Sequence, residues 1–253
     1  MSIEKTLAIV LDRIPFRETS SIAALLTRSL GRVSAIAKGV RRSPQSALVL
    51  ERGLLVEIVL YVKPNRDLHT AGQVSVAAYY PSIRGDLGKL ALRDAALELI
   101  LRSVPAPETQ TELFDFAREF LDRLEAADAA TLPVHELWRF FLGWAQHLGF
   151  MLNLRTCLRC GSESVAAEGG SLAIDRGGLL CRNCGGASAS GFIPGPAVSY
   201  LLADSSPGSD RFSEPLPGAV QKRLTRLFAD YCRFHLEIRS ALKAIGFLES
   251  VFF

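Results

Sequence analysis

Residues 21–40 read SIAALLTRSLGRVSAIAKGV, two short runs of small and β-branched residues separated by the turn signal SLGR. Runs of this length and composition are typical of β-strands, so the stretch predicts a β-hairpin. Alternation along the second run would place Val33 and Ala35 on one face and Ser34 and Ile36 on the other. This pattern does not by itself separate a core side from a solvent side.

Three more runs of the same kind lie on either side of the hairpin: TLAIVL (6–11), LLVEIVLYV (54–62) and QVSVAAYY (73–80). The connecting segments, which include RIPFRETS (13–20) and KPNRDLH (63–69), are rich in turn-forming residues. Five strands within about 80 residues predict a small closed barrel of the OB-fold type. An SH3-like barrel fits the pattern nearly as well.

The spacing of apolar residues becomes helical beyond the predicted barrel. Helical patterns are found at 87–104, 108–130, 134–150, 196–204 and 219–248. In the first of these, apolar side chains are expected on one side of the helix and charged side chains on the other. No internal repeat is visible.

Four of the five cysteines form two C-x2-C pairs, Cys157 with Cys160 and Cys181 with Cys184. Each pair directs two thiolates toward one point, and two pairs complete the tetrahedral four-sulfur shell that suits zinc. A closed shell leaves no position for water, so a structural rather than a catalytic ion is expected. Two disulfides or a redox pair are the alternatives, although no βαβ setting accompanies either pair. Cys232 stands alone in an apolar pattern and is expected to be buried.

These patterns divide the chain into three parts. Residues 1–80 are expected to form the barrel, residues 81–153 and 194–253 a helical domain, and residues 154–193 an inserted zinc-binding element. The predicted fold class is therefore α+β and multi-domain: an N-terminal five-stranded OB-fold barrel followed by an α-helical domain that carries a four-cysteine insert.

Charge is distributed unevenly along the chain. The whole protein has a formal net charge of +3, whereas residues 1–80 hold eleven Lys or Arg against six Asp or Glu, or +5 (11 − 6). Residues 19–50 contain no acid. A basic surface of this kind attracts phosphates by releasing counterions, and a small barrel with a cationic groove is a common platform for single strands. A merely solvated basic surface is the alternative.

Aromatic side chains that could stack on bases are few in the predicted barrel, namely Phe16, Tyr61, Tyr79 and Tyr80. Binding led by the nucleic-acid backbone, without sequence preference, is therefore expected. The chain contains no Walker A loop, no H-E-x-x-H and no G-x-S-x-G, so nothing in it predicts an enzyme. It also lacks a signal peptide and any apolar run of the roughly 18 residues that a membrane helix needs, which predicts a cytoplasmic protein.

The order of these parts resembles the family of bacterial recombination mediators called RecO. The most specific matches are the barrel strands with KGVRR (38–42) and the passage HLGFMLNLRTC (147–157). The segment YCRFHLEIRSALKAIGFL (231–248) fits the last helices of that family. The resemblance covers nearly the whole chain, apart from residues 202–217.

The resemblance implies a protein without enzymatic activity that binds single- and double-stranded DNA and anneals complementary strands. It implies action on the nucleoid with RecR, and often RecF, to help load RecA onto DNA coated by single-strand-binding protein. It also implies one structural zinc ion, and docking of the acidic tail of single-strand-binding protein on the helical part. A zinc-containing nucleic-acid-modifying enzyme and a protein-binding scaffold are the alternatives.

Carried onto this sequence, the family's basic position corresponds to Lys38, Arg41 and Arg42, which are expected to contact phosphate. Further DNA-binding candidates on the same domain are Arg28, Arg32, Lys63 and Arg66. Arg139 occupies a position where the family often has arginine and is expected to bind the partner's tail. A salt bridge on the helix surface is the alternative for Arg139.

Overall fold

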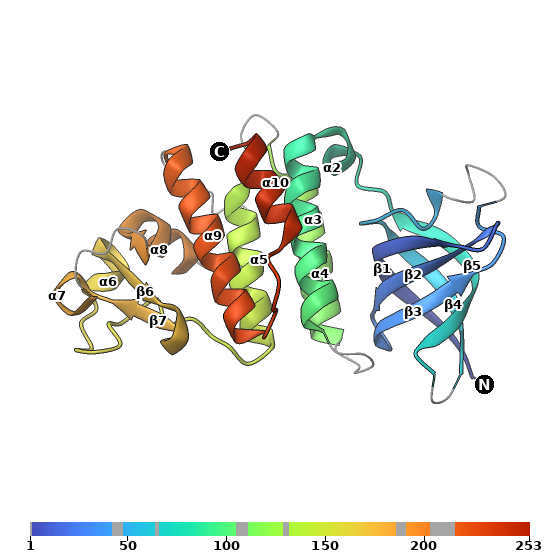
Figure 1. The fold of residues 1–253 in the computed structure, drawn as a ribbon, viewed down its shortest axis with the longest axis horizontal. Coiled ribbons are helices and arrows are strands. Elements are labelled where there is room, and N and C mark those ends of the chain that lie inside the picture. The colour runs from blue at the N-terminus through green and yellow to red at the C-terminus, as the bar shows by residue number, and fades with distance from the viewer. Residues whose placement is uncertain are drawn as a thin grey trace. The chain divides into compact units, whose positions relative to one another are not determined.

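The computed structural model of the protein describes residues 2–41, 48–63, 66–104, 111–128, 132–185, 191–202 and 216–253. The chain forms two compact units, Met1–Pro133 and Val134–Phe253. Their strands and helices are labelled in Figure 1. From the sequence, we predicted that residues 81–153 and 194–253 form one helical domain. This domain assignment stays a prediction.

Five strands of the first unit close into a barrel: β1 (Ser2–Phe16), β2 (Ser20–Thr27), β3 (Gly31–Ala37), β4 (Leu55–Val62) and β5 (Leu68–Ala78). The strands follow one another in the order β1-β2-β3-β5-β4, and β4 pairs with β1 to complete the ring (Figure 1). All pairs are antiparallel except β3 with β5, which are parallel. The predicted five-stranded barrel of the OB-fold type is confirmed.

Small and branched side chains fill the barrel. Along β3, Val33, Ala35 and Ala37 are buried, while Ser34 and Ile36 are partly exposed, so the alternation in the sequence does separate inside from outside. The core is completed by residues of the other strands, among them Ala8, Val10, Ala23, Leu25, Val56, Ile58 and Leu60. Each buried valine or leucine contributes about 1.5–3 kcal/mol, which makes this core the main source of barrel stability.

β1 is longer than predicted. Residues 13–20 were expected to form a turn, but the strand continues through Pro15 and only Arg17–Thr19 turn. β4 pairs with β1 only as far as Ile9. Pro15 therefore lies where β1 pairs, among the described strands, with β2 but not with β4, so the missing N–H of proline leaves no bond to β4 unmade. β5 likewise starts earlier than predicted, at Leu68.

The described part of the first unit also contains the helices α2 (Pro81–Gly85), α3 (Leu87–Ser103) and α4 (Thr111–Ala126). α2 was not predicted. The expectation of a charged solvent-facing side on α3 was wrong, because Lys89, Arg93 and Glu98 are all buried. α3 contacts β1, α2 and α4, so neighbours cover it on several sides.

Lys89 holds these three helices together. Its ammonium group is fully buried and donates to Oγ of Ser82 at 2.7 Å and to the carbonyl oxygens of Glu125 and Ala127 at 3.2 and 2.5 Å. The two carbonyls belong to the C-terminal end of α4, where the helix dipole attracts a cation. The carboxylate of Glu125 in turn accepts from the N–H groups of Ser82 and Ile83 at the start of α2.

The second unit combines helices with a small sheet. Its helices are α5 (Val134–His147), α6 (Ser164–Glu168), α7 (Arg182–Gly185), α8 (Gly195–Leu202), α9 (Gly218–His235) and α10 (Lys243–Val251). Its strands are β6 (Gly169–Ala173), β7 (Gly178–Leu180) and β8 (Phe192–Pro194), and the 3-10 turn η1 (Ile174–Arg176) joins β6 to β7. These short strands, inside the predicted cysteine-rich insert, were not predicted.

α5 and α9 lie side by side (Figure 1) and share buried polar contacts. Nε1 of Trp138 donates to Oγ1 of Thr225 at 2.9 Å, and the thiol of Cys232 donates to the carbonyl of Phe141 at 3.3 Å. Cys232 is buried as expected. The helical pattern of residues 219–248 is interrupted between α9 and α10, where Glu237 adopts a positive φ of 53°. Among the described residues, no helix combines the length and the apolar character needed to cross a membrane.

We expect the Lys89→Met variant to lose about 2 kcal/mol of the free energy of unfolding, because methionine leaves the hydroxyl of Ser82 and the carbonyls of Glu125 and Ala127 without this donor. Urea denaturation followed by circular dichroism measures the loss. Lys5→Met, at an exposed residue of β1, is the matched control and should change stability by less than about 1 kcal/mol. Equal midpoints for the two variants would contradict the role given to Lys89.

Candidate nucleic-acid interface and metal centre

Two turns bring three cations to one end of the barrel. Lys38 and Arg41 follow the last residue of β3, Arg17 lies in the turn between β1 and β2, and all three are exposed. The N–H of Arg41 donates to the carbonyl of Thr19 at 2.9 Å, and its Nη1 donates to the carbonyl of Arg17 at 3.3 Å. Backbone contacts thus fix this exit cluster, which consists of Arg17, Lys38 and Arg41.

The exit cluster is free of acidic partners among the residues that the structure describes. No carboxylate in those ranges lies within ion-pair distance of its three cations, although Glu18 is exposed in the same turn. The guanidinium of Arg17 lies over the ring of Phe16, 5.3 Å from its centroid. Arg42, the third residue expected at the basic position, lies outside the described residues.

The sequence interpretation missed Arg17 because it followed the basic run from residue 19 to residue 50 and stopped at its acidic border. The relevant signal was the strand order. In an antiparallel β1-β2-β3 sheet, the first turn and the exit of the third strand lie at the same end.

The parallel register of β3 and β5 places two other candidates toward the opposite end. Leu68 pairs with Ser34, so the loop from β4 to β5 precedes this point, on the side where β3 begins. That loop carries Lys63, which is partly exposed, and Arg66, which is exposed. The structure therefore does not bring Lys63 and Arg66 together with the exit cluster.

The remaining two barrel candidates are engaged inside the first unit. Arg28 makes a two-point ion pair with Asp115 of α4, with Nε–Oδ1 and Nη2–Oδ2 distances of 3.2 and 3.1 Å. Its hydrogen bond to Asp115 raises the pKa of Arg28. Nε of Arg32 donates to the carbonyl of Val104, at the end of α3, at 2.6 Å. Both contacts link the barrel to its helices and compete with phosphate for the guanidinium groups.

Four thiols converge in the second unit. The sulfur atoms of Cys157, Cys160, Cys181 and Cys184 all lie within 4.8 Å of one another. Gly161 follows the first pair with a positive φ of 73°, which lets the chain turn back sharply. The sulfurs of Cys160 and Cys181 are 3.7 Å apart, close to the roughly 3.8 Å expected in a tetrahedral four-sulfur shell with bonds of about 2.3 Å. The arrangement fits a metal ion.

Electrostatics also favours a cation between the thiols. The N–H of Cys181 donates to Sγ of Cys157 at 3.3 Å, and the N–H of Arg159 does so at 3.5 Å. These amides, with Cys181 the largest contribution, lower the pKa of Cys157 to about 6. The hydrogen bonds to Cys160 and Cys181 raise the pKa of Cys184, because they stabilise its protonated thiol. A metal ion would allow all four to ionise together.

For Arg139 of α5, a salt bridge on the helix surface was the alternative to binding a partner's tail. Among the described residues, Arg139 forms no ion pair with a carboxylate. Its guanidinium lies 4.3 Å from the centroid of Tyr200 of α8, and His135 meets the same ring edge-on at 5.1 Å. Nη2 of Arg139 is buried and has no hydrogen-bond partner in the described part of the chain. The residue therefore offers a cation beside an aromatic wall.

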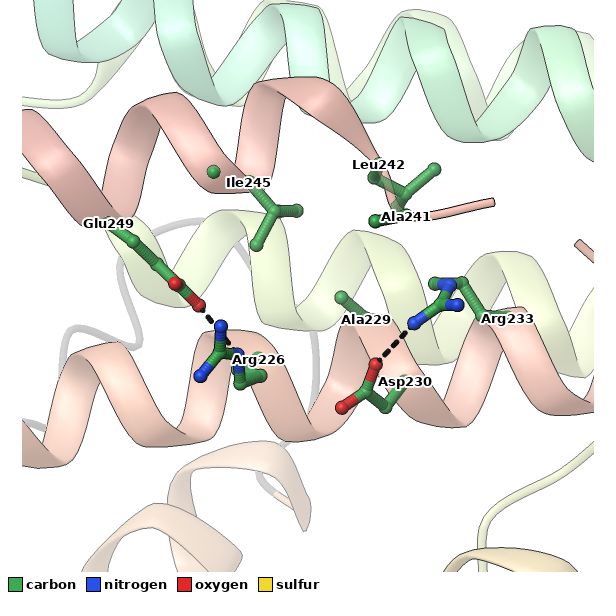
Figure 2. Close-up of a pocket in the computed structure, with 9 residues that line it drawn as sticks. Arg226, Ala229, Asp230, Arg233, Ala241, Leu242, Ile245 and Glu249 are labelled. Carbon is green, nitrogen blue, oxygen red and sulfur yellow. Dashed lines mark hydrogen bonds and ion pairs between the residues drawn. The ribbon is translucent and has the colours of Figure 1, made fainter. Parts of the chain in front are cut away.

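A pocket between α9 and α10 contains two more arginines (Figure 2). Nε of Arg226 lies 3.1 Å from Oε1 of Glu249, and Nη1 of Arg233 lies 2.8 Å from Oδ1 of Asp230. Its volume of about 160 Å3 is well below the roughly 300 Å3 at which small-molecule sites begin. Its cations are neutralised and its space is small, so this pocket has neither the form of an active site nor that of a free anion site.

Comparisons with known proteins agree with this arrangement of barrel, helices and cysteine pairs. Residues 1–80 match the family model described as Recombination protein O N terminal, and residues 84–243 match Recombination protein O C terminal. The DNA repair protein RecO of Geobacter metallireducens is 31% identical over 240 residues, which cover 89% of this chain and 94% of the relative. That of Anaeromyxobacter sp. is 31% identical over 252 residues, covering 98% and 96%.

The chain is thus similar, over nearly its full length, to a class of proteins named for DNA repair. It belongs to the recombination protein O (RecO) family. The resemblance expected from the sequence is confirmed.

We expect Arg32→Met to lower the free energy of unfolding by about 1 kcal/mol, since it removes the hydrogen bond to Val104 while keeping an aliphatic stem. Urea denaturation measures the change. Arg66→Met, at an exposed loop residue, is the matched control and should differ from the unaltered protein by less than about 0.5 kcal/mol. If the two variants are equally stable, the contact of Arg32 does not tie the barrel to α3.

Proposed function

We propose that the protein is a recombination mediator that binds DNA through the exit cluster of its barrel. Membership of the RecO family supports a role in DNA repair and recombination. The main support for the site is the geometry of three exposed cations, Arg17, Lys38 and Arg41, since contacts to backbone carbonyls join Arg41 to the turn that carries Arg17. Arg42 continues the same basic run. Contacts to phosphate give affinity without sequence preference.

The proposed substrates of the exit cluster are both single- and double-stranded DNA, since phosphates are common to the two. Two of the barrel aromatics are engaged within the protein, which limits their stacking on bases. Tyr80 is buried and donates to Asp122 at 3.0 Å, and the guanidinium of Arg84 covers Tyr79 at 4.4 Å. Neutralising phosphates also lowers the repulsion between two complementary strands, which is how the protein would promote their annealing.

The proposed partners are RecR, often with RecF, and single-strand-binding protein, on whose DNA the mediator helps to load RecA. Family membership is the support for these partners. Arg139 is the proposed contact for the acidic tail of single-strand-binding protein, because its buried Nη2 can still donate a hydrogen bond and Tyr200 provides an apolar wall. The role involves no catalytic step and is exercised on the nucleoid in the cytoplasm.

One structural zinc ion is proposed for the four-cysteine cluster. The support is the set of four sulfur ligands within 4.8 Å of one another, with one pair 3.7 Å apart, as expected of a tetrahedral shell. Four thiolates favour zinc over harder divalent ions. A four-sulfur shell is closed to water, so the ion would stabilise the fold and take no part in a reaction.

We expect the Lys38→Gln, Arg41→Gln double variant to bind all DNA sequences more weakly. The slope of log affinity against log salt should fall by about 1.4 for single strands, since each lost phosphate contact removes about 0.7. Fluorescence anisotropy of a labelled oligonucleotide, titrated through salt, measures affinity and slope together.

Lys5→Gln is the matched control for this experiment. Lys5 is an exposed barrel cation that pairs with Glu57 at 3.0 Å, so it is not expected to contact phosphate. Its salt slope should equal that of the unaltered protein. A double variant with an unchanged slope would place the phosphate site away from the exit cluster.

We expect Cys181→Ser to lose most of its zinc and to melt at a lower temperature, because a structural zinc ion contributes free energy of folding. Plasma emission spectroscopy gives the zinc content, and circular dichroism gives the melting temperature. Cys232→Ala removes a buried thiol outside the cluster and should retain zinc. Full zinc content and unchanged melting in Cys181→Ser would refute the proposed site.

A further inference from the structure

Three aromatic rings surround His235 at the end of α9. The ring centroids of Tyr231, Phe234 and Phe150 lie 4.5, 5.1 and 5.3 Å from that of His235. Phe234 is 57% exposed, Phe150 38% and the neighbouring Met151 69%, although side chains of this size are normally buried. Phe150, Met151, Phe234 and His235 form an aromatic patch on the surface of the second unit.

Hydrogen bonds position two residues of the aromatic patch, Phe150 and His235. The N–H of Phe150 donates to the carbonyl of Ala145 at 2.8 Å, and the hydroxyl of Tyr231 donates to the carbonyl of Phe150 at 3.1 Å. Nε2 of His235 lies 2.7 Å from the carbonyl oxygen of Ile174 in η1. The backbone of Phe150 and the ring of His235 are therefore held in place, which lowers the entropy lost when a ligand binds beside them.

The turn η1 that receives His235 also carries an exposed cation. Arg176 ends η1 and is exposed, and its Nη2 donates to the carbonyl of Leu158 at 3.4 Å. Leu158 directly precedes Arg159, an exposed arginine between the first two cysteines. Arg176 and Arg159 therefore lie near each other, on the side of the cysteine element that meets α9.

A third exposed arginine, Arg155, lies close to η1. The N–H of Asn153 donates to the carbonyl of Gly177 at 2.9 Å, which brings the exposed Arg155 close to the same turn. Exposed acids in the same region include Asp175 of η1 and Glu237 after α9, beside the three arginines. Positive charge beside solvent-exposed rings is the combination that single-strand-binding surfaces use.

We propose that the aromatic patch and these arginines form a second nucleic-acid site, selective for a single strand. Bases would stack on Phe150 and Phe234, while Arg155, Arg159 and Arg176 contact phosphates. The inference rests on the proposed function and deepens it. A duplex hides the faces of its bases and cannot use the rings, whereas the exit cluster accepts both forms. One chain would then have a phosphate site on one unit and a base-stacking site on the other.

Phe234→Ala tests the inference, with anisotropy measured for an oligothymidylate of about 16 nucleotides and for a duplex of the same length. We expect affinity for the single strand to fall roughly tenfold, and affinity for the duplex to stay within about twofold. Phe247→Ala is the matched control, because Phe247 is 42% exposed on α10 and lies outside the aromatic patch. Arg159→Gln, at an exposed residue, is a second variant that should also weaken single-strand binding.

Photocross-linking of an oligonucleotide that carries 5-iodouracil gives an independent readout. Cross-links to peptides that contain Phe150 or Phe234 support the site. If Phe234→Ala binds the single strand as tightly as Phe247→Ala does, and no such cross-link forms, the second nucleic-acid site is refuted and the aromatic patch is a contact for another protein.

The Lys38→Gln, Arg41→Gln variant separates this result from failure of the proposed function. If that variant loses both substrates while Phe234→Ala binds normally, only the second site is refuted. If the unaltered protein binds neither substrate, the proposed function fails.

Discussion

The parallel pairing of β3 with β5 is the constraint on which the barrel and the exit cluster depend. It joins the β1-β2-β3 sheet to the β4-β5 pair and so closes the ring. The pairing ends at Ala37 opposite Ala71, and the chain leaves the barrel there, with Lys38 as the next residue. Because Ser21 pairs with Ala37, the turn between β1 and β2 reaches the same end. Backbone hydrogen bonds thus decide where these cations gather.

Local periodicity and cysteine spacing were enough to predict the five strands, the helical remainder and the four-thiol cluster, since each signal lies within a short stretch of chain. The roles of individual arginines could not be predicted in this way. Arg28 and Arg32 belong to the same basic run as Lys38, yet they contact Asp115 and Val104 from other elements. Charge counts contain no information on such long-range partners. The burial of α3 escaped prediction for the same reason, because its covering neighbours lie elsewhere in the chain.

The cysteine cluster would support nucleic-acid binding as well as stabilise the fold. A metal held by the four sulfurs would fix Arg159 between two of its ligands, and η1 connects the same element to His235 of α9. A structural ion could therefore support nucleic-acid binding without touching the ligand. The two units would divide the work: the barrel would neutralise phosphates, and the second unit would hold unpaired bases.

The central claim is that DNA contacts the exit cluster, and hydrogen–deuterium exchange of the unaltered protein with and without a single-stranded oligonucleotide tests it most directly. The account predicts slower exchange at residues 17–19 and 38–41 when DNA is bound, because the ligand covers amides that are exposed or close to exposed turns. Unchanged exchange in both segments, under conditions where the oligonucleotide is fully bound, would contradict the claim.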